Sequence, residues 1–274
     1  MGTCVLKTRE KGGCLVSEVI EREMRDSVFY LWINRPEVLN AINPEVLEAL
    51  RAGLLAARDD ANVRAVVISG RGRGFCSGQE LNPAILQSSV QVRDMVLEMY
   101  NPVIEAMKNL QKPIIASVNG VATGAGLSLA MAADLRIASD QANFSVAFSK
   151  IGLAPDSGAS YYLPRLVGLS KAMEWAFLGT VIDAATALQT GLVNFVVTAD
   201  KLAQATHELA VRLANGPTVA LGLTKRALYE GVSGALTDAL EREALYQQLA
   251  SETQDFKEGV MAFQQKRAPS YQGH

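Results

Sequence analysis

The sequence predicts an α/β fold in which strands and helices alternate over residues 15–198 and helices alone follow over residues 199–274. Short apolar runs bounded by glycine, proline or asparagine indicate strands, and longer runs with apolar residues at helical spacing indicate helices. With 274 residues, 49% of them hydrophobic, the chain is long enough to bury a full core. We therefore expect one large domain with a helical C-terminal region, preceded by a loosely ordered arm over residues 1–14.

The first half of the chain has three short apolar patterns that predict strands, at residues 14–21, 28–33 and 64–69. A capping asparagine followed by proline predicts a helix over residues 43–59. The glycines that follow the third strand force a loop over residues 70–79. Helical periodicity then returns over residues 90–110. The order is strand, strand, helix.

The second half repeats this order. A strand is expected at residues 113–118, and it leads through a loop around Gly124 into a helix that contains the apolar residues 127–133. Three more apolar runs predict strands, at residues 134–138, 144–147 and 192–197. From there to Lys266 the pattern is helical, with breaks at the glycines near residues 216 and 231–234.

The C-terminal helical region has apolar side chains at close to helical spacing, at Leu236, Leu240, Leu245, Leu249, Phe256, Val260 and Phe263. Such a stripe can pack within the chain, which is the more common use, or it can form a helical interface between subunits.

Composition excludes several classes of function. The 26 basic and 28 acidic residues are interspersed and give a net charge of −2, so we expect no nucleic-acid partner. The uncharged residues 121–133 are too few to span a bilayer, and we expect no membrane partner. Cys4, Cys14 and Cys76 neither pair completely nor have metal-ligand spacing, so we expect reduced thiols, no bound metal and a cytoplasmic protein.

Two loops carry the candidate chemistry, and we expect them to face each other. The glycine-rich residues 119–126 follow a strand and open a helix, so their backbone N–H groups should lie at a helix N-terminus and stabilise an oxyanion. In the second loop, residues 151–158, Asp156 is the single acid of an uncharged run, where burial would raise its pKa toward that of a proton shuttle. The other interpretation of Asp156 is a turn or a helix cap. Together the loops indicate enolate chemistry.

Three motifs in one order resemble the crotonase superfamily, the family of enoyl-CoA hydratases and isomerases. They are NRPEVLNA at residues 34–41, GFCSGQEL at residues 74–81, and the segment from Lys112 to Asp134. The resemblance runs from about residue 14 to the C-terminus. It implies a spiral of strand-strand-helix repeats, a C-terminal helical trimerisation region and a homotrimer or a dimer of trimers. It also implies an acyl-CoA thioester as the substrate and no separate cofactor, since coenzyme A is part of the substrate.

By position, the resemblance implies that the backbone N–H groups of Gln79 and Ala125 form the oxyanion hole. Removing one such donor typically lowers the rate by ~100 to 1,000-fold. Contacts to coenzyme A or to the acyl group are implied for Arg35, Val38, Ser77, Glu80, Leu81, Asn82, Gly124, Phe148 and Lys266. The contact from Lys266 would come from an adjacent subunit. Tyr161 and Tyr162 could line an aromatic acyl pocket, but tyrosines beside Leu163 more often belong to the core or to an interface.

Two departures from the family's pattern decide the predicted reaction. Hydratases of this family hold water with two glutamates, and the matching positions here are Ser128 and Phe148, neither of which is an acid or a base at neutral pH. Isomerases of the family carry their acid in the loop that here contains Pro155 and Asp156. The resemblance is strongest to the branch that isomerises ring-epoxide acyl-CoA in phenylacetate catabolism. It implies either this reaction or a double-bond shift in a linear enoyl-CoA, with Asp156 as the proton shuttle.

Several alternatives remain. One is an enoyl-CoA hydratase of the same family, and another is a member that binds acyl-CoA without turning it over. An aryl-CoA dehalogenase would need a histidine soon after residue 79, and none is present. A serine hydrolase could use Ser128, which lies between a strand and a helix, but the only histidines are His207 and His274, and we expect His207 on a surface helix.

Overall fold

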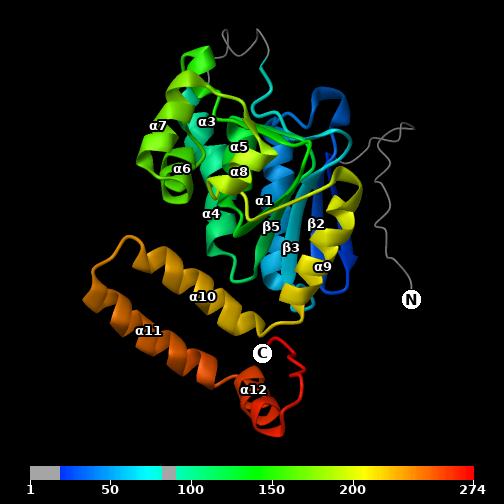
Figure 1. Ribbon diagram of the computed structural model, residues 1–274, viewed down its shortest axis with the longest axis vertical. Helices are drawn as coiled ribbons and strands as arrows, with labels where there is room; N and C mark the ends of the chain where they lie inside the picture. The colour runs from blue at the N-terminus through cyan, green and yellow to red at the C-terminus, as the bar shows by residue number, and fades with distance from the viewer. Residues whose placement is uncertain (1–18, 82–90) are drawn as a thin grey trace.

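The computed structural model describes residues 19–81 and 91–274, and these residues form two β-sheets with helices packed on them (Figure 1). The larger sheet has the order β1-β2-β3-β5-β7-β10, and the smaller has the order β4-β6-β8-β9. The strands of the larger sheet are β1 Ile20–Arg25, β2 Val28–Ile33, β3 Ala65–Gly70, β5 Ile114–Val118, β7 Leu135–Ser139 and β10 Phe195–Val197. Those of the smaller sheet are β4 Gly74–Cys76, β6 Val121–Thr123, β8 Asn143–Ser145 and β9 Ile182–Asp183.

The first strand differs from the prediction. It was expected at residues 14–21, but β1 continues to Arg25 and pairs with β2 in antiparallel register, Arg25 opposite Val28. The two residues between them, Asp26 and Ser27, both have positive φ, as a tight two-residue hairpin turn requires. This turn fixes the register, and the turn was not recognised in the sequence. Residues 14–18 lie outside the described part of the chain.

The repeated order strand, strand, helix is confirmed, and the two strands of each repeat belong to different sheets. In the pairs β3 and β4, β5 and β6, and β7 and β8, the first strand joins the larger sheet and the second joins the smaller one. Two of these second strands, β4 and β6, lie where loops were expected. Three-residue strands are too short to show a periodic pattern, and neighbouring parallel strands hold them in place.

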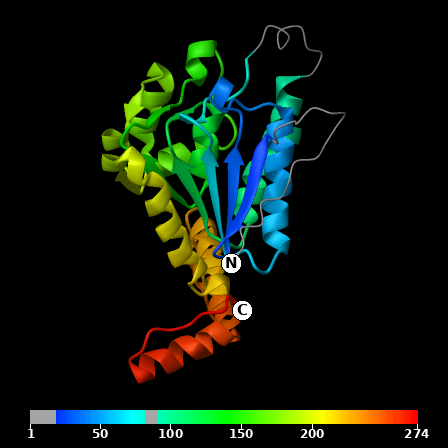
Figure 2. The same ribbon diagram turned by 90° about the vertical axis from the view of Figure 1, so that its right-hand side faces the viewer.

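Helices cover both faces of the larger sheet, as Figure 2 shows for α1 and α9. On one face lie α1 Pro44–Asp59, α4 Asn101–Asn109 and α5 Ala125–Ala132, and on the other lies α9 Leu202–Ala214. The predicted start of α1 is confirmed, because the backbone N–H of Val46 donates to Asn43 Oδ1 at 2.9 Å and Pro44 is its first residue.

The helical segment before β5 is interrupted rather than continuous. It consists of α3 Val92–Met95, a π-helical turn Val96–Tyr100 and α4. At the end of this turn the backbone N–H of Asn101 donates to the carbonyl of Val96, five residues earlier. Pro102 has no N–H to continue the ordinary ladder, which fits the wider turn just before it.

Shorter helices, one in the first half of the chain and the rest in the second half, connect the longer elements. They are the 3-10 helices η1 Pro36–Val38, η3 Phe148–Ile151 and η4 Ala199–Lys201, and the α-helices α6 Ala159–Val167, α7 Leu169–Leu178 and α8 Ala184–Gln189. None of the helices within the described ranges has the length and apolar content needed to cross a membrane.

The last three helices extend away from the sheets (Figure 1). They are α10 Thr218–Gly231, α11 Leu236–Ser251 and α12 Gln254–Gln265. The predicted apolar stripe on them does not pack within the chain, since Leu236 is 75% exposed and Phe263 is 85% exposed. Packing within the chain was therefore the wrong interpretation of this stripe.

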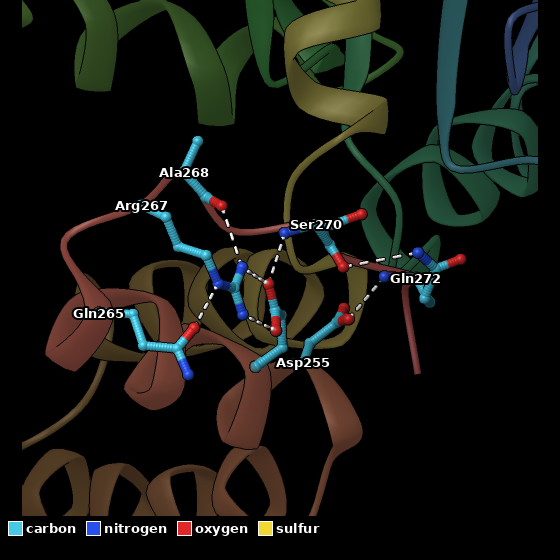
Figure 3. A network of polar contacts seen from close by, with 7 residues as sticks. Asp255, Gln265, Arg267, Ala268, Ser270 and Gln272 are labelled. Atoms are coloured by element: carbon cyan, nitrogen blue, oxygen red, sulfur yellow. Dashed lines mark hydrogen bonds and ion pairs between the residues drawn. The ribbon is translucent and has the colours of Figure 1, made fainter.

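A polar network fastens the C-terminal tail to α12 (Figure 3). The carboxylate of Asp255 accepts hydrogen bonds from the backbone N–H groups of Gln272 and Gly273 at 2.7 and 2.8 Å. Glu258 forms a bidentate ion pair with Arg267 at 2.6 and 2.8 Å, which holds the pKa of this glutamate at about 2. The tail is therefore fixed against α12, and the guanidinium of Arg267 is already paired.

Candidate active site

Three segments of the chain leave the smaller sheet at the same edge. Strands β4, β6 and β8 are parallel, so their carboxyl ends lie together. Gln79 follows β4, Ala125 follows β6, and Phe148 follows β8, each within three residues of the strand's end. The carboxyl edge of parallel strands is where α/β folds usually bind ligands.

The backbone N–H groups of Gln79 and Ala125 donate no hydrogen bond within the part of the chain that the structure describes. Ile42 bonds to the residues on either side of Gln79, accepting from the N–H of Glu80 and donating to the carbonyl of Gly78, which fixes the peptide between them. Ala125 is the first residue of α5, where the helix dipole favours negative charge. Both N–H groups can therefore donate to an anionic oxygen.

Glycines let the two loops approach backbone to backbone. A Cβ on Gly78 would lie 2.7 Å from the carbonyl oxygen of Thr123, and one on Gly126 would lie 2.2 Å from that of Cys76. Gly124 has φ 53 and ψ −125, a conformation that other residues avoid. The same packing buries the Cys76 thiol and raises its pKa to about 12, so this thiol is not a reactive group.

The loop that carries Asp156 does face the glycine loop, as predicted. The hydroxyl of Ser128, at the second turn of α5, lies 3.2 Å from the backbone oxygens of both Gly124 and Asp156. The Asp156 carboxylate accepts a hydrogen bond from Ser157 Oγ at 2.8 Å, and its side chain caps no helix. Burial raises the pKa of Asp156, partly offset by the Ser157 bond. Residues 156–159 do form a turn, in which the backbone N–H of Ala159 donates to the carbonyl of Asp156 at 2.9 Å, but the helix-cap interpretation of the side chain is not supported.

A cavity of about 200 Å³ lies between these loops. Asp156 is the one carboxylate among the described residues that line it. Most of the other side chains in its wall are apolar, and they include Leu81, Val92, Met95, Phe148, Ile151 and Leu153. At the two positions where the family's hydratases have glutamates, Ser128 is fully buried and Phe148 forms part of the apolar wall.

Seven of the residues predicted for the site line this one cavity, namely Ser77, Gln79, Leu81, Gly124, Ala125, Phe148 and Asp156. Others predicted to bind the substrate do not line it. Arg35 forms an ion pair with Glu80 at 2.8 Å, and the same guanidinium nitrogen donates to the carbonyl of Ala41 at 2.7 Å. Val38 is exposed beside the site, and its carbonyl accepts from the hydroxyl of Ser77 at 3.2 Å.

Two further predicted residues lie apart from the cavity or beyond the described residues. Lys266 directly follows α12, which lies apart from α5 and the sheets in Figure 1, and it does not line the cavity of its own chain. Asn82 lies outside the described residues. Tyr161 and Tyr162 line a different cavity, between the core and α10, and Tyr162 is buried in the core, which favours the core interpretation of these two residues over an acyl pocket.

Sequence reasoning missed several residues of the cavity wall, among them Met95, Tyr100 and Lys150. Tyr100 and Met95 come from the interrupted helical segment, and nothing in its periodicity marks the face that meets the cavity. For Tyr100, a polar aromatic residue two positions before a proline was the available signal.

The structure separates the residues that a serine hydrolase would need. The hydroxyl of Ser128 bonds only to backbone oxygens, and the residue is fully buried. His207 lies on α9, on the opposite face of the larger sheet, where its Nδ1 is 2.8 Å from the hydroxyl of Tyr30. The helix does lie at the surface, as expected, and His207 is partly buried where it packs on the sheet. The described residues also include no group of three histidine, cysteine, aspartate or glutamate side chains that could hold a metal.

Known proteins resemble the chain over nearly its whole length. The family model of enoyl-CoA hydratase/isomerase matches residues 23–274. The 1,2-epoxyphenylacetyl-CoA isomerase of Escherichia coli is 40% identical over 259 residues, covering 93% of this chain and 99% of that protein. A Rhodobacter capsulatus protein named "Probable enoyl-CoA hydratase" is 38% identical over 254 residues, covering 93% and 98%.

Solved structures agree with this result. The crystal structure of enoyl-CoA hydratase from Bacillus anthracis matches with a TM-score of 0.88 at 32% identity, covering 93% of this chain and 99% of that one. The resemblance predicted from the three motifs is therefore confirmed, and so is the predicted fold. The chain belongs to the enoyl-CoA hydratase/isomerase family of the crotonase superfamily.

Proposed function

We propose that this enzyme is an acyl-CoA isomerase in which Asp156 moves a proton between two carbons of a thioester-stabilised enolate. The observation that carries the proposal is the composition of the cavity wall. Among the described residues, the wall combines a single carboxylate with two backbone N–H groups, at Gln79 and Ala125, that donate no hydrogen bond within the chain. The reaction is either a double-bond shift in an enoyl-CoA or the isomerisation of a ring epoxide to an oxepin in an aryl acyl-CoA.

In the proposed reaction, the thioester oxygen accepts hydrogen bonds from the N–H groups of Gln79 and Ala125. These two hydrogen bonds strengthen as negative charge moves onto that oxygen, and the backbone N–H groups add no titratable proton to the site. The Asp156 carboxylate takes a proton from one carbon of the acyl chain, which yields the enolate and a neutral acid. The same acid then returns the proton at a different carbon, so that no atom is gained or lost.

Hydration is less well supported because it needs groups to hold and deprotonate water. Ser128 is fully buried and bonds to backbone oxygens, and Phe148 makes its wall apolar. An apolar wall beside the carboxylate keeps competing water away from the enolate. Some relatives are named as hydratases, so hydration is the outcome that the first experiment must distinguish.

That experiment offers the enzyme three CoA thioesters: a linear 2-enoyl, a linear 3-enoyl and a ring-epoxide arylacetyl thioester. We expect products of unchanged mass from the 3-enoyl or the ring-epoxide substrate, because isomerisation moves a proton without adding atoms. Mass spectrometry separates this result from hydration, which adds one water. A hydrated product that dominates would overturn the proposal.

A protein that binds acyl-CoA without turnover would give neither product. Hydrogen–deuterium exchange then distinguishes the two cases. In deuterium oxide, only an enzyme with a working base exchanges the protons on the carbon next to the thioester or on the carbon two positions further along the acyl chain. Absence of exchange together with tight thioester binding would show a silent binder.

The pH profile of kcat/KM should have an acid limb set by Asp156. Its carboxylate must be ionised to take a proton, and burial raises its pKa above the ordinary value of 3.8. Activity is therefore expected to fall as the pH drops through this raised pKa. Replacing Ser157 with alanine removes the hydrogen bond that lowers the pKa, so the limb should move to higher pH. Initial rates across the acid and neutral range measure this shift.

The matched control for this prediction is Ser160→Ala, which removes an exposed hydroxyl at the second residue of α6. It should leave the acid limb where it is in the unmodified enzyme. An acid limb at the same pH in Ser157→Ala and in the unmodified enzyme would mean that a group other than Asp156 sets it.

The binding of coenzyme A and the assembly of subunits remain proposals. We propose that Ser77 and Leu81 in the cavity wall and Val38 beside it contact the substrate, because all three are partly or largely exposed. We also propose that α10, α11 and α12 form a homotrimer interface, supported by the exposed apolar stripe on them. In such a trimer Lys266 would reach the coenzyme A of an adjacent subunit.

A further inference from the structure

One polar group in the cavity wall has no role in the proposed proton transfer. Tyr100 ends the π-helical turn Val96–Tyr100 and lines the same cavity as Asp156 and Phe148. Its side chain is 5% exposed, and its hydroxyl has no hydrogen-bond partner among the residues that the structure describes. A buried hydroxyl without a partner destabilises the folded protein, because it has lost its hydrogen bonds to water without replacing them.

The surroundings of this hydroxyl make it a donor rather than a base. Burial raises the pKa of Tyr100 well above its ordinary value of 10.0, and the nearby charge of Asp156 raises it further. The phenol is therefore protonated near neutral pH and can donate a hydrogen bond. The apolar side chains that line the same cavity offer this donor little, since Val92 and Leu153 have no acceptor and the thioether of Met95 is only a weak one.

The groups already assigned to the reaction do not satisfy this donor. The carboxylate of Asp156 accepts from Ser157 Oγ, and no hydrogen bond joins it to Tyr100 in the described residues. In the proposed reaction the thioester oxygen is bound by the backbone N–H groups of Gln79 and Ala125. An acceptor for Tyr100 must then come from another part of the substrate.

We propose that Tyr100 is a specificity-determining residue whose hydroxyl donates a hydrogen bond to an oxygen atom on the acyl group of the substrate. This inference rests on the proposed isomerase function and narrows its substrate. It favours an acyl group that carries an oxygen beside the reacting carbons, such as a ring epoxide, over a linear hydrocarbon chain. A site built to donate a hydrogen bond discriminates strongly against a substrate that has no acceptor.

The test compares Tyr100→Phe with the unmodified enzyme on a ring-epoxide arylacetyl-CoA and on a linear 3-enoyl-CoA. We expect kcat/KM for the ring epoxide to fall by about 10-fold or more, because one hydrogen bond to the substrate is lost. For the linear substrate the change should stay below about 3-fold, since that acyl chain has no oxygen to accept the bond. The ratio of the two values is the measured quantity.

A thermal melt provides a second readout. Tyr100→Phe removes an unpartnered buried hydroxyl, so its Tm should equal or exceed that of the unmodified enzyme. The control is Tyr30→Phe, on the opposite face of the sheet, which breaks the bond to His207 and should lower Tm while leaving the substrate ratio unchanged. Equal losses on both substrates, or no loss on the ring epoxide, would overturn the role of Tyr100.

Failure of this inference is distinguishable from failure of the proposed function. If the unmodified enzyme isomerises only the linear substrate, the assignment to Tyr100 is wrong and the isomerase function stands. If it isomerises neither substrate and hydrates a 2-enoyl-CoA instead, the proposed function itself is wrong.

Discussion

Asp156→Asn is expected to lower kcat/KM for isomerisation by about 1,000-fold or more. The amide has nearly the shape of the carboxylate, and its oxygen can still accept the hydrogen bond from Ser157 Oγ. It cannot take up the proton, and general acid–base catalysis typically contributes 10²–10⁴-fold to a rate. Because Asp156 is the one carboxylate among the described residues of the cavity wall, no neighbouring acid there replaces it. Initial rates with the CoA thioester that the unmodified enzyme converts best measure the effect.

Two controls separate this loss of proton transfer from loss of structure. Binding of a non-reactive acyl-CoA, measured by calorimetry, should be close to that of the unmodified enzyme, because the backbone N–H groups of Gln79 and Ala125 are untouched. Tm should also be preserved, since the side chain caps no helix. Turnover by Asp156→Asn within about 10-fold of the unmodified enzyme would show that another group moves the proton.

Much of the fold followed from local patterns. The helix that begins after Asn43 was predictable because its cap and its proline both act within one turn. The central strands β3 and β5 of the larger sheet are buried on both faces and so appear as largely apolar runs. In contrast, β4 and β6 have three residues each, and only their parallel partners make them strands.

The candidate site was predictable where its chemistry lies in the backbone or in one isolated charge. The glycine loop and Asp156 both stand out against their neighbours in the chain. Side chains brought in by distant elements did not stand out. Tyr100 reaches the cavity from a π-helical turn, and the pairing of Arg35 with Glu80 depends on how η1 meets the loop after β4. Both depend on tertiary packing, which no local pattern encodes.

One buried ion pair helps to attach α10 to the core, and breaking it should give a large loss of stability. Lys225 on α10 lies 2.9 Å from Oδ2 of Asp134 and also donates to the carbonyl of Met107 at 2.8 Å. The side chains are 8% and 19% exposed, and the same Asp134 oxygen accepts from the N–H of Ile114. Burial raises the pKa of Asp134 and lowers that of Lys225, and each charge opposes the shift of the other.

Lys225→Met keeps the aliphatic stem and removes the charge, which leaves Asp134 buried without its cation. We expect a destabilisation of about 3 kcal/mol, measured by urea unfolding at one fixed protein concentration near neutral pH. Adding Asp134→Asn should recover most of this loss, because the double variant has no unpaired charge and its amide oxygen can still accept from Ile114. The control Lys201→Met, at an exposed lysine of η4, should change stability little.

The destabilisation caused by Lys225→Met should depend on pH, whereas a destabilisation caused only by lost packing should not. In Lys225→Met the unpaired Asp134 has a folded-state pKa raised above its unfolded value, so the folded state binds more protons. The penalty is therefore absent below the unfolded pKa and grows as the pH rises toward the folded pKa. The stability gap between Lys225→Met and the unmodified enzyme should shrink when the pH is lowered from neutral toward that window. A gap that stays constant with pH would attribute the loss to packing of the side chain, and a gap near zero at neutral pH would show that the ion pair does not hold α10.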